Sequence, residues 1–131
     1  MIGTRFGTRW VRVSAALLAL ALPAGALAQA LDGKALYHAK CGGCHSLDAN
    51  RIGPAHRGIV GRRIATTPGY AYSAAIKKLP GVWTAALLDR WLTGPQKLAP
   101  GSKMYLTVND AGQRAAIIAY LASASPPNPP R

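Results

Sequence analysis

The sequence has few cysteines, few acidic side chains and no long hydrophobic run. Its 131 residues include 2 cysteines and 4 acidic side chains, against 16 lysines and arginines. Two cysteines cannot form a framework of several disulfides. The main apolar run, residues 13–22, is shorter than the roughly 20 residues that a membrane-spanning helix needs. The sequence also shows no internal repeat and no convincing pair of strands, which disfavours repeat architectures and β folds.

Residues 1–28 are typical of a secretory signal peptide. A basic start precedes the apolar run: Arg5, Arg9 and Arg12. Residues 26–28 (Ala-Leu-Ala) fit the small-x-small cleavage rule, which predicts cleavage before Gln29, with a site after Ala30 as second choice. There is no paired arginine, so the twin-arginine export route is not indicated. An uncleaved membrane anchor is the alternative, and the short apolar run disfavours it. We therefore expect a periplasmic protein that is not inserted in the membrane after cleavage.

Residues 29–131 have the length of one domain. The segment 123–131 holds four prolines and is expected to be a loose tail. The exported chain keeps 13 basic and 4 acidic side chains, a net charge of +9. This charge favours protein partners with acidic docking faces. Nucleic acid is disfavoured, because the chain is exported and has no dense run of lysine and arginine, and we expect a monomer.

The pattern Cys41-Gly-Gly-Cys44-His45 matches C-x-x-C-H, the attachment site of a c-type haem. Two thiols three positions apart can each form a thioether with one vinyl group of the porphyrin, and His45 then offers a nitrogen to the iron. A disulfide or half of a zinc site is the alternative. Zinc needs four ligands, and neither His38 nor His56 is spaced as a partner for this group. Because so small a core is marginal without the porphyrin, we expect the haem-free chain to fold poorly.

The pattern along the chain predicts an all-α fold of short helices and loops. Asp32 is expected to cap a helix running into Cys41, Thr84 a helix ended by Gly94-Pro95, and Asp110 the last helix. A short helix is expected over 72–78, after a structured loop over 50–68. The last two long helices have apolar faces: Leu87, Leu88, Trp91 and Leu92 on the first, and Ile117, Ile118 and Leu121 on the second.

The ligand opposite His45 decides whether the iron is closed or open. A thioether there closes the iron and stabilises the ferrous state, which suits electron transfer, whereas an open site suits gas binding or peroxide chemistry. Met104 is the one methionine outside the signal, and it lies behind a Pro-Gly turn rather than on a predicted apolar helical face. Core packing is the alternative for Met104. His56 is a rival ligand, and His38 is expected to face solvent.

The segment from Asp32 to Ala122 resembles a class I cytochrome c of the mitochondrial and bacterial cytochrome c2 type. The motifs that carry the resemblance are the Cys41–His45 pattern, Gly53-Pro54, Gly58-Ile-Val-Gly61-Arg62, Gly69-Tyr-Ala-Tyr72-Ser73, Trp83, Trp91-Leu92, Pro100-Gly-Ser-Lys-Met104 and Ala119-Tyr-Leu121. The Pro-Gly-x-Lys-Met element after C-x-x-C-H is highly specific for this family. The resemblance implies a cytochrome c fold around one covalent haem c, with Met104 as the second axial ligand of the iron.

The resemblance also implies roles for residues around the haem. The carbonyl of Pro54 is expected to accept a hydrogen bond from the other ring nitrogen of His45 and so orient the imidazole. Arg62, Tyr72 and Trp83 match positions that bond or neutralise haem propionates, and core packing is the alternative for Trp83. The first helix is expected to contact the last through four residues: Gly33, Tyr37, Ile117 and Tyr120.

Several positions depart from the family pattern. Trp91 stands where a tyrosine is usual near the methionine sulfur, and an indole can donate a hydrogen bond but not accept one. Ile76 stands where an asparagine is common. Lys40, Lys97 and Lys103 match a ring of lysines at the haem edge, whereas Gln96 replaces a lysine. The sequence does not predict how these changes together alter the midpoint potential of the haem iron.

The function that follows is one-electron transfer, with no catalytic residue of its own. Redox partners with acidic faces are expected, such as a membrane oxidase, a cytochrome complex or a periplasmic dehydrogenase. The alternative is a haem-based binder of small ligands, or a weak peroxidase, with a labile Met104. A dedicated electron-accepting subunit of one dehydrogenase is a third hypothesis.

Overall fold

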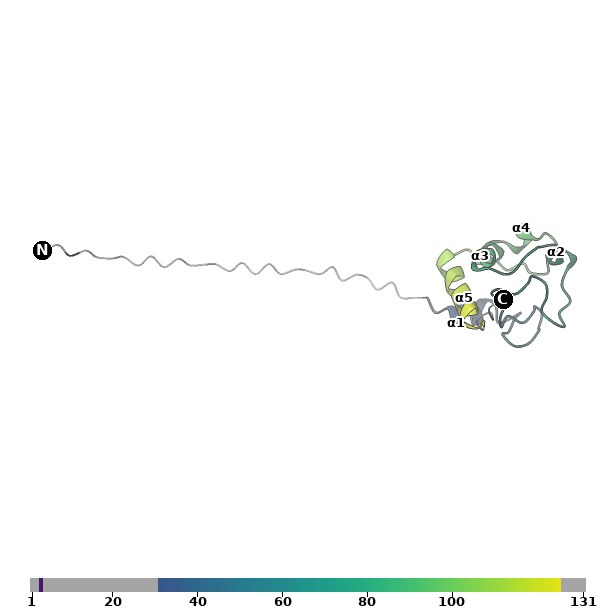
Figure 1. The fold of residues 1–131 in the computed structure, drawn as a ribbon, viewed down its shortest axis with the longest axis horizontal. Helices are drawn as coiled ribbons and strands as arrows, with labels where there is room; N and C mark the ends of the chain where they lie inside the picture. The colour runs from purple at the N-terminus through teal and green to yellow at the C-terminus, as the bar shows by residue number, and fades with distance from the viewer. Residues whose placement is uncertain (1–2, 4–30, 126–131) are drawn as a thin grey trace.

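The computed structural model describes residue 3 and residues 31–125 (Figure 1). Apart from residue 3, the predicted signal peptide lies outside the described residues, as do residues 126–131 of the predicted tail. Five helices form between residues 31 and 125: α1 (Gly33–Lys40), α2 (Ala74–Lys77), α3 (Ala85–Thr93), α4 (Pro95–Leu98) and α5 (Ala111–Ser123). The same range holds no β-strand, only one isolated antiparallel bridge between Arg63 and Val82. The predicted all-α fold is therefore confirmed.

Side-chain caps fix the starts of the three longest helices, as the sequence predicts. Asp32 accepts hydrogen bonds from the first backbone amides of α1 at 3.0 Å. Thr84 does the same for α3 at 3.1 Å, and Asp110 for α5 at 2.7 Å. Each cap satisfies amides that have no partner inside the helix, so the boundaries follow from the local sequence.

Two short helices differ from the prediction. The helix expected over 72–78 begins only at Ala74, because the hydroxyl of Ser73 caps it by accepting from the amide of Ile76. The sequence did not predict α4. Gly94-Pro95 ends α3, as expected, but Pro95 also begins α4. Proline lacks the amide proton that would have no partner in a first helical turn, so it suits that position.

Helices α1 and α5 pack against each other, and Figure 1 shows them side by side. Gly33 lies so close to the Ala116 carbonyl of α5 that a Cβ on Gly33 would clash with it. The ring of Tyr37 is 1% exposed and lies 5.3 Å from that of Tyr120. Ile117 is fully buried in the same region. The predicted contact between the first and last helices is confirmed.

The buried core joins α5 to α3 and to Trp83 in the preceding loop. Leu88, Trp91 and Leu92 of α3 are buried, as their predicted helical face requires. Arg114 of α5 donates to Asp89 of α3 at 2.7 Å and to the carbonyls of residues 108 and 109. This arginine thereby fixes the start of α5 against α3. No described helix is long and apolar enough to cross a membrane.

Candidate functional site

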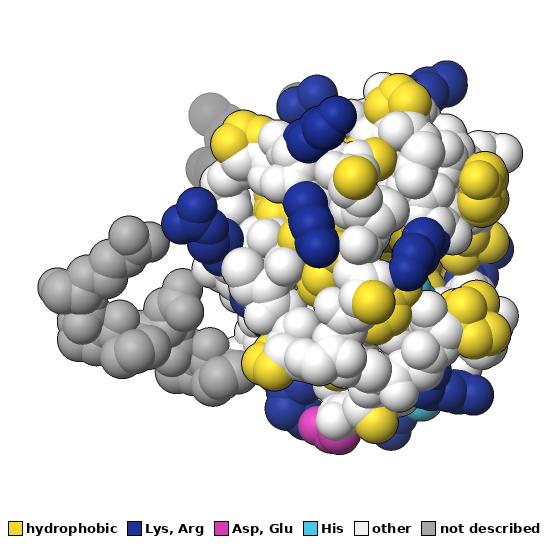
Figure 2. Space-filling view, turned by 90° about the vertical axis from the view of Figure 1, so that its right-hand side faces the viewer, with side chains coloured by type: hydrophobic (Ala, Val, Ile, Leu, Met, Phe, Trp, Pro, Cys, Tyr) yellow, Lys and Arg dark blue, Asp and Glu magenta, His cyan; other side chains and the backbone are white. Residues whose placement is uncertain are grey.

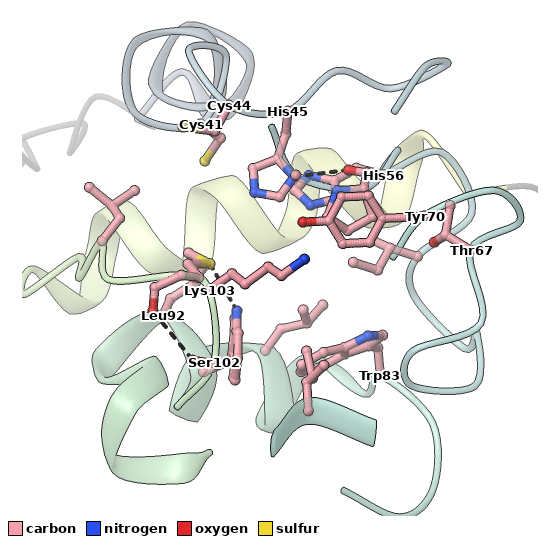
Figure 3. A pocket seen from close by; sticks show the side chains of 18 of the residues that line it. Cys41, Cys44, His45, His56, Thr67, Tyr70, Trp83, Leu92, Ser102 and Lys103 are labelled. Carbon is pink, nitrogen blue, oxygen red and sulfur yellow. Dashed lines mark hydrogen bonds between the residues drawn. The ribbon is translucent and has the colours of Figure 1, made fainter. Parts of the chain in front are cut away.

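One cavity of about 320 Å³ collects every site residue that the sequence singled out. The eight are Cys41, Cys44, His45, Pro54, Arg62, Tyr72, Trp83 and Met104. Most of the remaining lining is hydrophobic and comes from α3, α5 and the loops around residues 52–59 and 104–106. Residues far apart in the sequence thus surround one largely apolar space (Figure 3).

The two cysteines and His45 follow directly from the end of α1. The amide of Cys41 donates to the carbonyl of Tyr37 at 2.8 Å, and the amide of His45 donates to the carbonyl of Cys41 at 2.8 Å. The chain therefore continues to turn after Lys40, which brings the two thiols and the imidazole to the same cavity. Both cysteines are free thiols, Cys41 buried and Cys44 exposed. Burial raises the pKa of Cys41 to about 11, so its thiol is protonated at neutral pH.

The ring of His45 is held in one orientation. Its Nδ1 lies 2.9 Å from the carbonyl oxygen of Pro54. A carbonyl only accepts, so Nδ1 carries the proton and Nε2 keeps its lone pair. Gly53 lies against the ring so closely that a Cβ there would clash with the imidazole. Burial lowers the pKa of His45, and the bond to Pro54 opposes that shift. The ring is thus a neutral imidazole suited to metal ligation.

His56 lies on the same side of the cavity as His45. The two imidazoles stack with centroids 4.0 Å apart and planes at 21°, and Figure 3 shows them together. Burial, followed by electrostatic interaction with His45 and Arg62, lowers the pKa of His56 to about 3. Its Nδ1 and the hydroxyl of Tyr37 have no hydrogen-bond partner among the described protein atoms. As a neighbour of His45, His56 is poorly placed for the opposite axial position. His38 is exposed, as predicted.

Met104 lines the cavity from the loop after α4. Ser102 and Lys103, which precede it, lie across the cavity from His45 (Figure 3). The indole Nε1 of Trp91 donates to the sulfur of Met104 at 3.1 Å. The ring of Trp91 is itself fixed by an edge-on contact with Trp83, 5.5 Å between centroids. Tryptophan in place of tyrosine at position 91 therefore still provides a hydrogen-bond donor to the sulfur of Met104, and this donor belongs to a buried side chain of the core.

Lys103 ties the Met104 loop to the loop before α2. Its Nζ donates to the carbonyl of Ala71 at 2.6 Å and lies 5.7 Å from the centre of the Tyr70 ring. The hydroxyl of Tyr70 in turn donates to the carbonyl of Ile52 at 2.9 Å. Side-chain bonds thus join three loops that line the cavity, those of Lys103, Tyr70 and Ile52.

Two of the three residues predicted to meet propionates, Arg62 and Tyr72, lie together at Thr67, whereas the ring of Trp83 contacts Trp91. The guanidinium of Arg62 donates to the carbonyl of Ala55 at 3.0 Å and to the hydroxyl of Thr67 at 2.6 Å. The hydroxyl of Tyr72 accepts from the amide of Thr67 at 3.3 Å. Arg62 thus brings a fixed positive charge to the wall of a mostly apolar cavity, where a carboxylate needs a cation or donor.

Sequence reasoning missed the role of Gln96. It noted only that glutamine replaces a lysine, whereas the amide of this side chain contacts the loop that carries Met104. An amide side chain close in sequence to the Met104 loop was the available signal, but no periodicity or motif links the two.

Comparisons with known proteins find similar sequences and a similar fold. The family model for cytochrome c matches residues 30–125. Cytochrome c2 of Rhodopila globiformis is 44% identical over 94 residues, which are 70% of this chain and 89% of that protein. Cytochrome c of Sesamum indicum is 38% identical over 72% of this chain and 88% of its own length. The solved structure of cytochrome cH from Methylobacterium extorquens superimposes with a TM-score of 0.67, at 38% identity, over 72% of this chain and 97% of that one.

A further relative is longer than the matched region. The cytochrome c-type cyt cy of Rhodobacter capsulatus is 39% identical over 101 residues, and the match spans about half (51%) of that protein.

Proposed function

Because the chain belongs to the cytochrome c family, we propose that it carries single electrons between periplasmic redox proteins, with its iron held by His45 and Met104. Members of this family are monohaem electron carriers and not enzymes. The cofactor of this chain is haem c, attached through Cys41 and Cys44. One observation carries the ligation proposal. His45, oriented by Pro54, and Met104, bonded by Trp91, line a single cavity.

The side chains present suit a covalently attached haem. Cys41 and Cys44 supply the two thiols for its vinyl groups, and His45 presents an unprotonated Nε2. Arg62 supplies a positive charge for a propionate. When bound, the haem supplies an iron that passes between the ferric and ferrous states. The protein keeps water from that iron with its apolar lining, and a thioether from Met104 favours the ferrous state.

The surface supports a partner with an acidic docking face. Each of the four carboxylates accepts hydrogen bonds from the chain itself, Asp32 and Asp110 as helix caps and Asp48 and Asp89 in pairs with arginine. Figure 2 shows lysine and arginine side chains around exposed apolar atoms, with acidic atoms only at its lower edge. We call five residues at the mouth of the cavity the cavity rim: Lys40, Ile52, Lys103, Tyr105 and Leu106. Ile52 and Tyr105 are 76% and 75% exposed, so the rim combines positive charge with apolar contact area.

Electron exchange with an anionic reagent should be fast and salt-sensitive. With ferrocyanide as reductant, we expect the rate to fall as ionic strength rises, because exposed charges are screened over about 8–10 Å at ordinary ionic strength. Lys40→Glu should slow the reaction several-fold at low salt, whereas Lys34→Glu, also exposed on α1 but away from the rim, should slow it less. Stopped-flow traces over a salt series make the measurement. Equal effects of both variants would contradict docking at the rim.

Export is the second part of the proposal. The family match begins at residue 30, close to the proposed cleavage site before Gln29, which supports residues 1–28 as a signal peptide and residues 29–131 as one domain. We expect the periplasmic fraction of a producing cell to contain a chain that has the mass of residues 29–131 plus one haem. A haem-loaded chain that keeps residues 1–28 and stays with the membrane would support an anchor instead.

Two simple experiments distinguish the rival functions from a free electron carrier. A ligand binder or weak peroxidase requires an iron that exogenous ligands reach, so the reduced protein would bind carbon monoxide readily. A dedicated dehydrogenase subunit would co-purify with one partner at ordinary salt, whereas a shuttle forms small and transient encounters.

A further inference from the structure

The loop that carries Met104 has little backbone support of its own. Within the described chain, no bond from backbone to backbone involves residues 103–107, whereas the amide of Ser102 donates to the carbonyl of Ala99 at 3.0 Å and that of Val108 to the carbonyl of Leu92 at 2.8 Å. The segment between these two anchors therefore takes its position from side chains. Gln96 and Trp91 provide contacts to Met104 itself.

Gln96 contacts the loop at four points. Its Nε2 lies 2.8 Å from the carbonyl of Ser102, 2.9 Å from the hydroxyl of Ser102 and 2.8 Å from the carbonyl of Met104. Its Oε1 accepts from the amide of Gly101 at 3.1 Å. The surroundings determine which end of the amide is which, because a carbonyl only accepts and a backbone amide only donates. Neither a carboxylate nor an ammonium group reproduces this combination of donor and acceptor.

The helix that carries Gln96 is itself anchored. Pro95 is buried, and the amide of Ala99 donates to its carbonyl at 2.8 Å. Gly101 has a φ of 88°, so the loop turns sharply back toward α4 at the point where its amide meets Gln96. The amide group thus joins a fixed helix to both ends of a tight turn, Gly101 on one side and Met104 on the other.

We propose that Gln96 is a positioning residue that holds the Met104 loop closed and thereby keeps exogenous ligands from the iron. The proposal rests on Met104 as an axial ligand, the function proposed above. Movement of the loop would separate the carbonyls of Ser102 and Met104 from the donors of Gln96, so the closed loop is favoured. The glutamine at a position where a lysine is common in the family makes this possible, because a lysine has no acceptor for the amide of Gly101.

Ligand displacement in the haem-loaded protein tests this proposal. We would follow the loss of the weak long-wavelength Met–iron band of the ferric protein after addition of imidazole, in wild type, Gln96→Met and Gln96→Glu. Gln96→Met keeps the length and neutrality of the side chain but removes its donors, and Gln96→Glu places a carboxylate against three oxygens. Gln113→Glu makes the same chemical change on α5, away from the loop, and serves as control.

We expect displacement to be at least about tenfold faster in Gln96→Met, because the loss of even one of the four contacts has about that effect. Gln96→Glu should be faster still, and Gln113→Glu should match wild type. The Gln96 substitutions should change the free energy of global unfolding by guanidinium less than they change the activation free energy of displacement, because only the loop is released. An unchanged displacement rate in both Gln96 variants would overturn the proposal. So would an acceleration that, expressed as a free energy, is no greater than the change in the free energy of global unfolding. A wild-type protein without the Met–iron band would instead overturn the ligation proposal on which it rests.

Discussion

Replacing Met104 by leucine should convert the protein from a closed electron carrier into a ligand-binding haem protein. Leucine has a similar volume, so the half-buried site should stay filled. It has no sulfur for the iron or for the indole of Trp91, which donates at 3.1 Å in the wild type. The reduced variant should therefore bind carbon monoxide, and the ferric variant should become high-spin.

The midpoint potential should fall in the same variant. A thioether ligand favours the ferrous state, and axial ligands span a range of roughly 0.8 V in haem proteins, so a fall of a few tenths of a volt is expected. Optical titration and a carbon monoxide difference spectrum make the measurement. A Met104→Leu protein that remains low-spin and rejects carbon monoxide would show that another residue is the sixth ligand.

Trp91→Phe provides the matched control for Met104→Leu. It keeps the thioether but removes the indole N–H that donates to the sulfur. A donor on the sulfur draws electron density away from it and so favours the ferrous iron. We therefore expect Trp91→Phe to remain low-spin and closed to carbon monoxide, with a fall in potential much smaller than that of Met104→Leu. Equal falls in the two variants would mean that the hydrogen bond, not the ligand, sets the potential.

The haem-free chain should lack a cooperative thermal transition. The cavity of about 320 Å³ lies at the centre of the only extensive packing among the described residues. At about 24 cal/mol per Å³, an empty cavity of this size costs about 8 kcal/mol, within the 5–15 kcal/mol that stabilises a typical domain. Filling it with water instead would wet a mostly hydrophobic lining. Either way, little stability is left.

The chain for this experiment is the double variant Cys41→Ser/Cys44→Ser, which cannot form the thioethers, without its signal sequence. Circular dichroism during heating makes the measurement, with the haem-loaded wild type as control. We expect a sharp transition for the control and a gradual, probe-dependent change for the haem-free chain. A single cooperative melt of the haem-free chain would show that α1, α3 and α5 hold together without the porphyrin.

The sequence by itself determined the parts of this protein that depend on neighbours along the chain. Cys41, Cys44 and His45 are close in sequence, so their spacing alone predicts haem attachment. Asp32, Thr84 and Asp110 cap amides two or three residues ahead, and the three main helices begin where these caps predict. The motif that ends in Met104 predicts a sixth ligand through its resemblance to a family, and that ligation remains a proposal.

The tertiary structure decided what depends on contacts between distant segments. The stacking of His56 on His45 arises because two segments of the loop region fold back on each other, and no local pattern encodes that contact. Trp91 donates to the sulfur of Met104 because α3 packs beneath the Met104 loop. Gln96 reaches Gly101 and Met104 only because Pro95 begins a helix that the sequence did not predict. Capping and haem attachment depend on short-range contacts and can be predicted from spacing, whereas the bonds that hold the Met104 loop require the folded chain.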